Sequence, residues 1–329
     1  MKPAVDQLVS ASPRALPDMM FEASVLEESS SRSPSSIPES PRARRRLREQ
    51  RIPSRMSQVR LLDVLVPVSL SLLLFVALCA AFPAAIAPHL PTDMHTDAIL
   101  SEPGRTYWFG TDQFGRDVFS LVVYGARQSV LIGIFSVLIS CTIGVSIGLT
   151  AGYAGGWLDM ALMRFIDIWM AIPNILLAIA LSTVLGPSLV NTIFAISVTA
   201  IPKYARILRG QALLVRSRPF IEASRAAGAS HFSILRRHVL PHCSVQIMVL
   251  ATLGVGSSIL IGSGLSFLGL GVNDERPDWG FLLTQGRSYL SVAWWTVTFP
   301  GLAITSLVVS VNLLGDALRR RLDPRSAPR

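Results

Sequence analysis

Long apolar runs alternate with short polar segments along most of this chain, a pattern that predicts membrane-spanning helices. A helix needs about 20 apolar residues to cross the hydrocarbon core of a bilayer, and six stretches approach or exceed that length. The predicted spans are residues 61–84, 127–151, 158–182, 188–207, 244–268 and 292–315. The expected fold class is therefore an all-α membrane protein with six transmembrane helices.

Composition supports this class and divides the chain into regions. Of the 329 residues, 50% are hydrophobic, as expected for a multi-span protein rather than a soluble globule. Residues 1–56 are rich in Ser, Pro and Arg and predict a disordered basic cytosolic arm. Its arginine run, residues 42–51, suits either anionic lipid head groups or a topology signal, and we favour the second. Residues 57–110 form the first span and an outer loop, and residues 111–325 the core.

Charge is distributed unevenly between the loops and predicts the orientation of the chain. Residues 203–242 carry eight Lys or Arg and one acid, whereas residues 85–117 carry five acids and two arginines. The positive-inside rule places the basic segment 203–242 in the cytosol. Because the number of predicted spans is even, both termini lie on one side of the membrane, and the same rule makes that side the cytosol. The net charge of +9 is thereby assigned to cytosolic membrane flanks and not to nucleic-acid binding.

The basic cytosolic segment contains the most informative motif, Glu222-Ala-Ser-Arg-Ala-Ala-Gly228, with Leu240-Pro241 further along. Its alanines favour a helix of little bulk that can enter a groove on a partner. Gly228 can end that helix in a left-handed conformation, and Pro241 is expected to stop whatever helix precedes it. The alternative is an ordinary amphipathic surface helix joining two spans.

This segment resembles the cytoplasmic EAA loop of permease subunits in ATP-binding-cassette (ABC) importers. Ser224 replaces the second alanine of that pattern, and His238 stands at its usual isoleucine. The stretch 108–117, Trp-Phe-Gly-Thr-Asp-Gln-Phe-Gly-Arg-Asp, is similar to the C-type permease of the dipeptide/oligopeptide/nickel branch. It also predicts a compact, internally hydrogen-bonded turn. The resemblance extends over residues 60–325 and includes 124–127, 269–272, 277–280 and 316–325.

The resemblance implies a type I ABC importer permease in a bacterial inner membrane, with a coupling loop at residues 208–242. Implied partners are a homologous B-type permease, two cytosolic ABC ATPases and an extracytoplasmic substrate-binding protein, working by alternating access. Peptides are the expected substrate, with nickel, glutathione or opines as alternatives. The residues implied in ATPase coupling are Glu222, Ala223, Ala226, Ala227, Gly228, Leu240 and Pro241.

The chain lacks the residues that ATP hydrolysis would require. Its two lysines, Lys2 and Lys203, do not belong to a phosphate-binding loop, so ATP is expected to bind to partner subunits. We expect no enzyme activity, no cofactor and no metal. His238 and His242 have the spacing of two zinc ligands, but Pro241 is expected to break the helix between them.

Small, charged and aromatic residues within the spans give further candidates. Gly144, Gly148 and Gly152 predict a face for close helix packing. Arg164 and Asp167 are three residues apart and predict an intramembrane pair, either a gate or a structural contact. The fifth span offers pore-lining candidates, with tight packing as the alternative: Ser257, Ser258, Gly262 and Ser263. Five tryptophans near span ends predict an aromatic belt: Trp108, Trp157, Trp279, Trp294 and Trp295.

A transporter driven by an ion gradient is the alternative function. It would require buried acids or broken helices at mid-membrane in matching halves of the chain, and only Asp167 comes near this description.

Overall fold

Helices make up most of the chain that the structure describes, which is residues 53–272 and 278–322 of this computed structural model. Two units are distinguished, Met1–Leu61 and Leu62–Arg329. Of the first unit only the beginning of helix α4 is described. The predicted basic arm, residues 1–56, therefore lies outside the described residues except for residues 53–56, which start α4.

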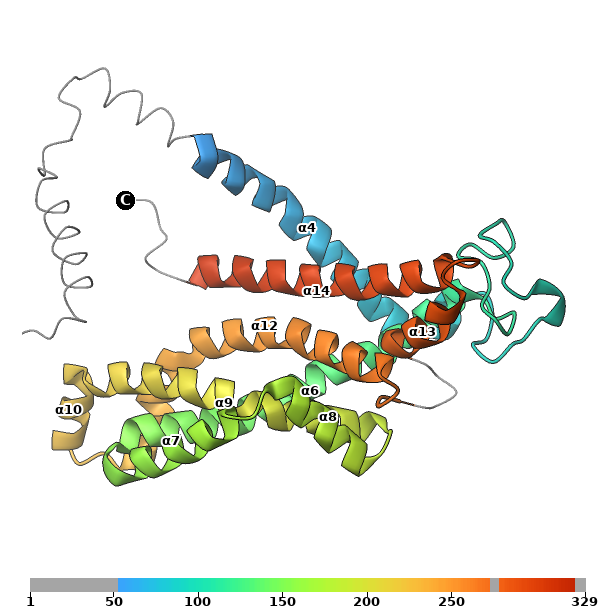
Figure 1. Ribbon diagram of the computed structural model, residues 1–329. Coiled ribbons are helices and arrows are strands. Elements are labelled where there is room, and N and C mark those ends of the chain that lie inside the picture. The colour runs from blue at the N-terminus through green and yellow to red at the C-terminus, as the bar shows by residue number, and fades with distance from the viewer. Residues whose placement is uncertain (1–52, 273–277, 323–329) are drawn as a thin grey trace, which may run out of the picture. The chain divides into compact units, whose positions relative to one another are not determined.

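Helices occupy all six predicted spans (Figure 1). They are α4 (Pro53–Ala81), α6 (Val118–Ala154), α7 (Gly156–Met170) with α8 (Asn174–Leu185), α9 (Leu189–Arg216), α12 (Leu240–Phe267) and α14 (Trp295–Leu322). The shorter helical elements are α5 (Pro83–Ile86), η1 (Thr96–Ala98), α10 (Pro219–Ala226), α11 (His231–Ile234), η2 (Leu235–Val239), α13 (Trp279–Gly286) and η3 (Arg287–Tyr289).

Within the described ranges, fewer than six helices are both long enough and apolar enough to cross a membrane by these criteria alone. Three helical runs pass, namely α6, residues His231–Phe267 and α14, and the pair α7 and α8 passes as a fourth although it is bent by 79°. The bend lies at Pro173, which stands at the N-cap of α8 and cannot continue the helix before it. The other two regions are α4, whose described apolar part is Leu65–Ala81, and α9, whose second half carries four cations.

The packing of α6 against α9 is the most extensive contact between helices in the unit Leu62–Arg329. Predicted close packing through the α6 glycines is confirmed. A Cβ on Gly148 would lie 2.4 Å from the Ala205 carbonyl oxygen, and one on Gly152 2.6 Å from the Arg209 carbonyl oxygen. Only glycine lets the two backbones approach this closely.

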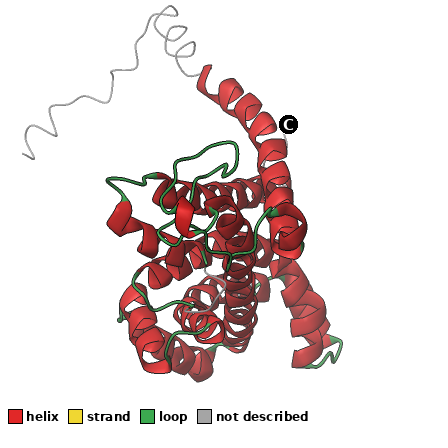
Figure 2. Ribbon diagram, turned by 90° about the vertical axis from the view of Figure 1, so that its right-hand side faces the viewer, coloured by secondary structure: helices red, strands yellow, loops and turns green. Residues whose placement is uncertain are grey.

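Polar loops and short helices gather at the two ends of the same unit. In Figure 1, α10 lies at one end of the long helices, and the loop of residues 87–117 with α13 lies at the other. Figure 2 views the unit from the second end, where the loops cross in front of the helices. Trp279 and Trp295 are buried here, 1% and 2% exposed, which corrects their assignment to an aromatic belt.

Candidate functional site

In the segment 218–243, residues with strong backbone preferences determine where helix α10 begins and ends. Arg218 has the extended conformation that a residue before proline favours, and Pro219 occupies the first turn of α10. Gly228 ends the helix with φ +81°, as predicted. The amide of Ala229 donates to the Ser224 carbonyl (3.1 Å) and that of Gly228 to the Arg225 carbonyl (2.9 Å), which together form a Schellman motif.

One face of α10 anchors the helix to the rest of the subunit. Ile221 is fully buried in a cluster that α6, α9 and α12 also supply. The Arg225 guanidinium lies 5.2 Å from the centre of the Tyr153 ring, and the Tyr153 hydroxyl is 3.0 Å from Nδ1 of His231. These contacts hold α10 against the end of α6, so its opposite face has a fixed direction.

The opposite face is exposed, and it carries the predicted coupling residues. Glu222, Ala223, Ala226 and Ala227 are all exposed. Within the described ranges Glu222 has no ion-pair partner, although eight cations lie in the same segment of sequence. A rigid helix with a small-residue face and one unpaired carboxylate can receive a complementary protein surface.

The prediction that Pro241 stops the preceding helix is wrong. Residues His231–Phe267 form one continuous helical run, because the π-turn η2 precedes Pro241. In this wider turn the Leu240 amide bonds to the Leu235 carbonyl, which shifts the hydrogen-bond register and accommodates a proline that has no amide hydrogen. Leu240 is exposed and lies at the start of α12, away from α10 in sequence.

His238 and His242 therefore lie on one uninterrupted helix, contrary to expectation. His242 Nδ1 is 2.7 Å from the His238 carbonyl oxygen, and the His242 ring stacks on Phe220 (4.9 Å, 24°). Among the described residues, no group of three or more His, Cys, Asp or Glu side chains is placed to hold a metal ion. Phe220 of α10 contacts both histidine rings and thereby connects α10 to the helical run His231–Phe267.

Three of the four predicted pore-lining residues are corrected, because they face the interior of the subunit. Ser258 and Ser263 are 4% and 8% exposed. A Cβ on Gly262 would lie 2.7 Å from a methyl carbon of Ile132, so this position is a tight helix contact. Tight packing, the alternative interpretation, describes these three, and Ser257 alone is exposed.

The predicted pair Arg164–Asp167 is also corrected, because the partner of Asp167 is Arg206 on α9. A second ion pair joins the same two helices: Arg209 donates to both Asp159 carboxylate oxygens, at 2.6 and 2.7 Å. Sequence spacing shows pairs within one helix but not pairs between helices. The repeated occurrence of acids on α7 and bases on α9 was the available signal.

The outer motif, residues 110–117, forms a dense hydrogen-bonded turn, as predicted. Asp112 accepts from the amides of Phe114 and Arg116, both at 2.9 Å, and from Arg116 Nε at 2.7 Å. Arg116 also donates to Gln285 near the end of α13, at 2.9 Å. Asp117 caps α6 by accepting from the amide and the hydroxyl of Ser120, at 3.1 and 2.6 Å.

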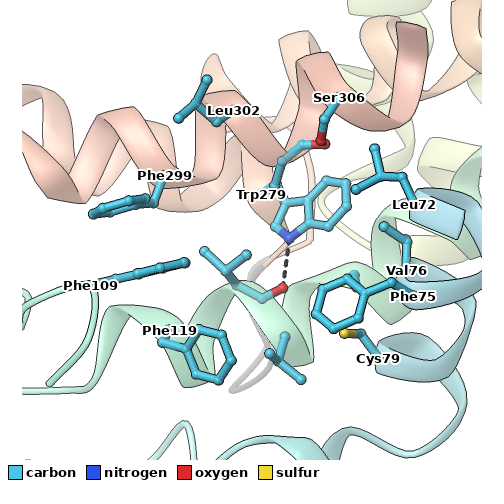
Figure 3. Close-up of a pocket in the computed structure, with 14 residues that line it drawn as sticks. Leu72, Phe75, Val76, Cys79, Phe109, Phe119, Trp279, Phe299, Leu302 and Ser306 are labelled. Atoms are coloured by element: carbon cyan, nitrogen blue, oxygen red, sulfur yellow. Dashed lines mark hydrogen bonds between the residues drawn. The ribbon is translucent and has the colours of Figure 1, made fainter. Parts of the chain in front are cut away.

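An apolar cavity of about 450 Å³ lies between α4, α6, α13 and α14 (Figure 3). Phe75, Phe119 and Phe299 are among its lining side chains. The indole nitrogen of Trp279 donates to the Val122 carbonyl at 2.8 Å and is thereby satisfied. A cavity with almost no free polar group suits hydrocarbon and does not suit a peptide, whose amides need hydrogen-bond partners.

Comparison with known proteins shows the family to which most of this chain is similar. Residues 144–327 match the family described as "Binding-protein-dependent transport system inner membrane component". The dipeptide transport system permease protein DppC of Alkalihalophilus pseudofirmus is 44% identical over 69% of this chain and 74% of its own length. The di/tripeptide permease DppC of Pseudomonas aeruginosa is 40% identical over 77% of this chain and 86% of its own length.

Two further similarities concern substrate and fold. The glutathione transport system permease protein GsiD of Pectobacterium atrosepticum is 42% identical over 70% of this chain and 76% of its own. A chain of the MetNI methionine ABC transporter, solved in an inward-facing conformation, superposes with a TM-score of 0.51 at 22% identity. That superposition covers 62% of this chain and 96% of the MetNI chain, and shows a shared fold.

Proposed function

Because this chain belongs to the family of binding-protein-dependent transport system inner membrane components, we propose that it imports di- and oligopeptides as the C-type permease of an ATP-driven transporter. The family is one of multi-pass transport permeases and not a class of enzymes. Relatives named for dipeptide and di/tripeptide transport support a peptide substrate. The relative named for glutathione, itself a peptide, is compatible with the same substrate class.

The observation that carries the mechanism is the exposed alanine face of α10, held in place by buried Ile221. Its size and fixed direction suit docking into a groove of a cytosolic ATPase. Force from ATP-driven closure would pass from α10 through Phe220 and His242 into α12. The second path is from Arg225 through Tyr153 into α6.

The complete transporter in this proposal contains a homologous B-type permease, two ABC ATPases and an extracytoplasmic binding protein. ATP binds to the ATPases, and this chain contributes no catalytic residue or cofactor. The two lysines of the sequence support this division of labour, since neither belongs to a phosphate-binding loop. No observation favours an ion-gradient mechanism.

We propose that α10 and both chain termini face the cytosol, as the charge asymmetry between the loops supports. Single cysteines at exposed Thr106 and Ser288 should react with an impermeant maleimide added from outside. Cysteines at Ser217, Ser40 and Ser326 should react only after the membrane is opened. The native cysteines Cys79, Cys141 and Cys243 are buried and give little background. External labelling at Ser217 would refute the orientation.

Reconstituted uptake tests the function itself. Proteoliposomes with all subunits should accumulate a labelled dipeptide only when ATP is enclosed with the ATPases and the binding protein is outside. A protonophore should leave initial uptake unchanged, whereas uptake without ATP that collapses with the ion gradient would contradict the proposal. Mass spectrometry of the ligand that co-purifies with the binding protein then separates peptides from glutathione, nickel and opines.

A further inference from the structure

The cytosolic ends of α9, α12 and α14 enclose a cleft of about 640 Å³ next to α10. Arg218 and Arg319 supply its positive charge, and Gln211, Gln246 and His242 supply further polar groups. No acidic side chain lines it within the described ranges. Arg218 and Arg319 have no ion-pair partner among the described residues. The cleft therefore presents two available guanidinium groups and favours an anion.

The rest of the lining is apolar, which distinguishes this cleft from a site for a small soluble anion. Leu214, Val215, Val245, Val249 and Leu322 form that part of its wall. Val215 and Val249 are buried, whereas Leu214 is 62% exposed. A ligand that satisfies both halves must carry a negative group joined to hydrocarbon.

The cleft also lies where the apolar sequence of the helices ends. α14 changes from apolar residues to the cluster Arg319–Arg321 in its last turn, and α9 ends at Arg216. α12 has Pro241 and His242 in its first turn, before its apolar run. In a membrane this level is that of the lipid head groups, and basic clefts between helices on the cytosolic side are suited to anionic head groups.

We propose that this cleft binds the phosphate head group of an anionic phospholipid of the cytosolic leaflet. The guanidinium groups of Arg218 and Arg319 contact the phosphate, and the apolar wall contacts the start of an acyl chain. Because Arg218 directly precedes α10 and Phe220 also lines the cleft, the bound lipid would brace α10 against α12. The site is separate from the alanine face of α10.

Lipid retention tests the proposal without ATP or transport. The full chain, purified with whatever partner subunits it retains, is exchanged into nanodiscs of phosphatidylcholine with a minor fraction of phosphatidylglycerol and then analysed by native mass spectrometry. The double variant Arg218→Gln/Arg319→Gln should retain at least fivefold less phosphatidylglycerol than the wild type. The double variant Arg218→Lys/Arg319→Lys should retain most of it and shows that the fold is intact.

The matched control is Arg236→Gln/Arg237→Gln, which removes the same charge from exposed positions outside the cleft. An equal loss in this control, or undiminished retention in Arg218→Gln/Arg319→Gln, would overturn the proposal. Inorganic phosphate separates the two sources of the anion. If phosphate protects the chain from thermal unfolding and phosphatidylglycerol does not, the cleft is a site for a soluble anion and the lipid assignment is wrong. Retained lipid with lost ATPases would identify the cleft as part of the ATPase interface instead.

Discussion

The outer motif at residues 110–117 and the α10 segment are the two most conspicuous motifs of the sequence, yet they use charge in opposite ways. Asp112, Arg116 and Asp117 are buried at 5%, 8% and 3% exposure, and each has partners within the chain. Glu222 is exposed and has no ion-pair partner in the described ranges. A buried charge needs a partner within its own chain, whereas an exposed unpaired charge on a rigid helix is available to another protein.

The comparison separates stability from assembly. Substitutions in the outer motif should lower the stability of the chain and leave its association with ATPases intact. Substitutions on the exposed face of α10 should do the reverse. The tests of Glu222→Lys/Ala223→Trp and of Asp112→Asn measure both stability and ATPase association, so that either region can be found to behave like the other.

The largest effect is expected from Glu222→Lys/Ala223→Trp, which puts like charge and bulk on the exposed face of α10. Co-purification of the ATPases should fall at least tenfold, because the added indole cannot enter a groove that fits alanine. The thermal midpoint of the chain should stay within about 2 °C, since neither position is buried.

The matched control for that variant is Glu102→Lys/Thr106→Trp, an equal change at exposed positions of the outer loop. It should leave ATPase recovery unchanged. Persistent ATPase binding by the α10 variant, together with normal transport, would show that residues 222–228 are an ordinary surface helix.

Asp112→Asn should be the most destabilising of the predicted changes. The NH₂ group of asparagine would replace a carboxylate oxygen that accepts from a backbone amide or from Arg116 Nε, so that two hydrogen-bond donors would face each other. The buried Arg116 guanidinium would also lose its counter-charge. Loss of such a buried pair costs about 2–4 kcal/mol. A thermal-shift assay should report it, with ATPase binding of the surviving folded fraction unchanged. Asp97→Asn, at an exposed position of the same loop, should have no measurable effect.

Gly228→Val is expected to have an intermediate effect through the backbone alone. A Cβ at Gly228 meets no atom within 4 Å, but φ is +81°, so valine would be strained by about 1–2 kcal/mol. The Schellman end of α10 would loosen, and substrate-stimulated ATP hydrolysis should fall while membrane insertion persists. Gly210→Val is the control, since Gly210 has equal space and an ordinary helical φ. Normal stimulation in Gly228→Val would contradict the role of this helix end.

Features that depend on local residues can be predicted from the sequence, whereas contacts between distant segments cannot. The end of α10 at Gly228 and the bend at Pro173 follow from residues at those positions. The partner of Asp167, Arg206, is 39 residues away, whereas sequence spacing points to the nearby Arg164. Serine and glycine in the fifth span suit both a pore and a tight helix contact, and only the facing helix decides. The passage of a helix through Pro241 depended on a π-turn that has no simple sequence pattern.

Asp278 is an exception to the pairing of buried charges. It is a buried acid at the same end of the molecule as the outer motif, and no cation among the described residues lies within ion-pair range of it. Its carboxylate caps α13 by accepting from the Phe281 amide at 2.8 Å, and it accepts from the Ser266 hydroxyl at 2.5 Å. Burial raises the pKa of Asp278 above its ordinary value, against the lowering effect of these hydrogen bonds. Hydrogen bonding alone therefore supports this acid.

The smallest expected effect is a change of stability with pH, and the raised pKa of Asp278 determines its direction. Above the ordinary carboxyl pKa of about 4 the unfolded chain has lost this proton while the folded chain keeps it, so stability falls as pH rises until the folded pKa is passed. Asp278→Asn removes this titration and remains a good N-cap, so it should flatten that part of the stability profile at a cost of about 1 kcal/mol or less. Thermal midpoints between pH 4 and 8 measure the slope. Asp278→Ala is the control, since it loses the cap and should be less stable at every pH. If Asp278→Asn keeps the wild-type slope, another group causes the dependence, and the titration of Asp278 does not contribute to it.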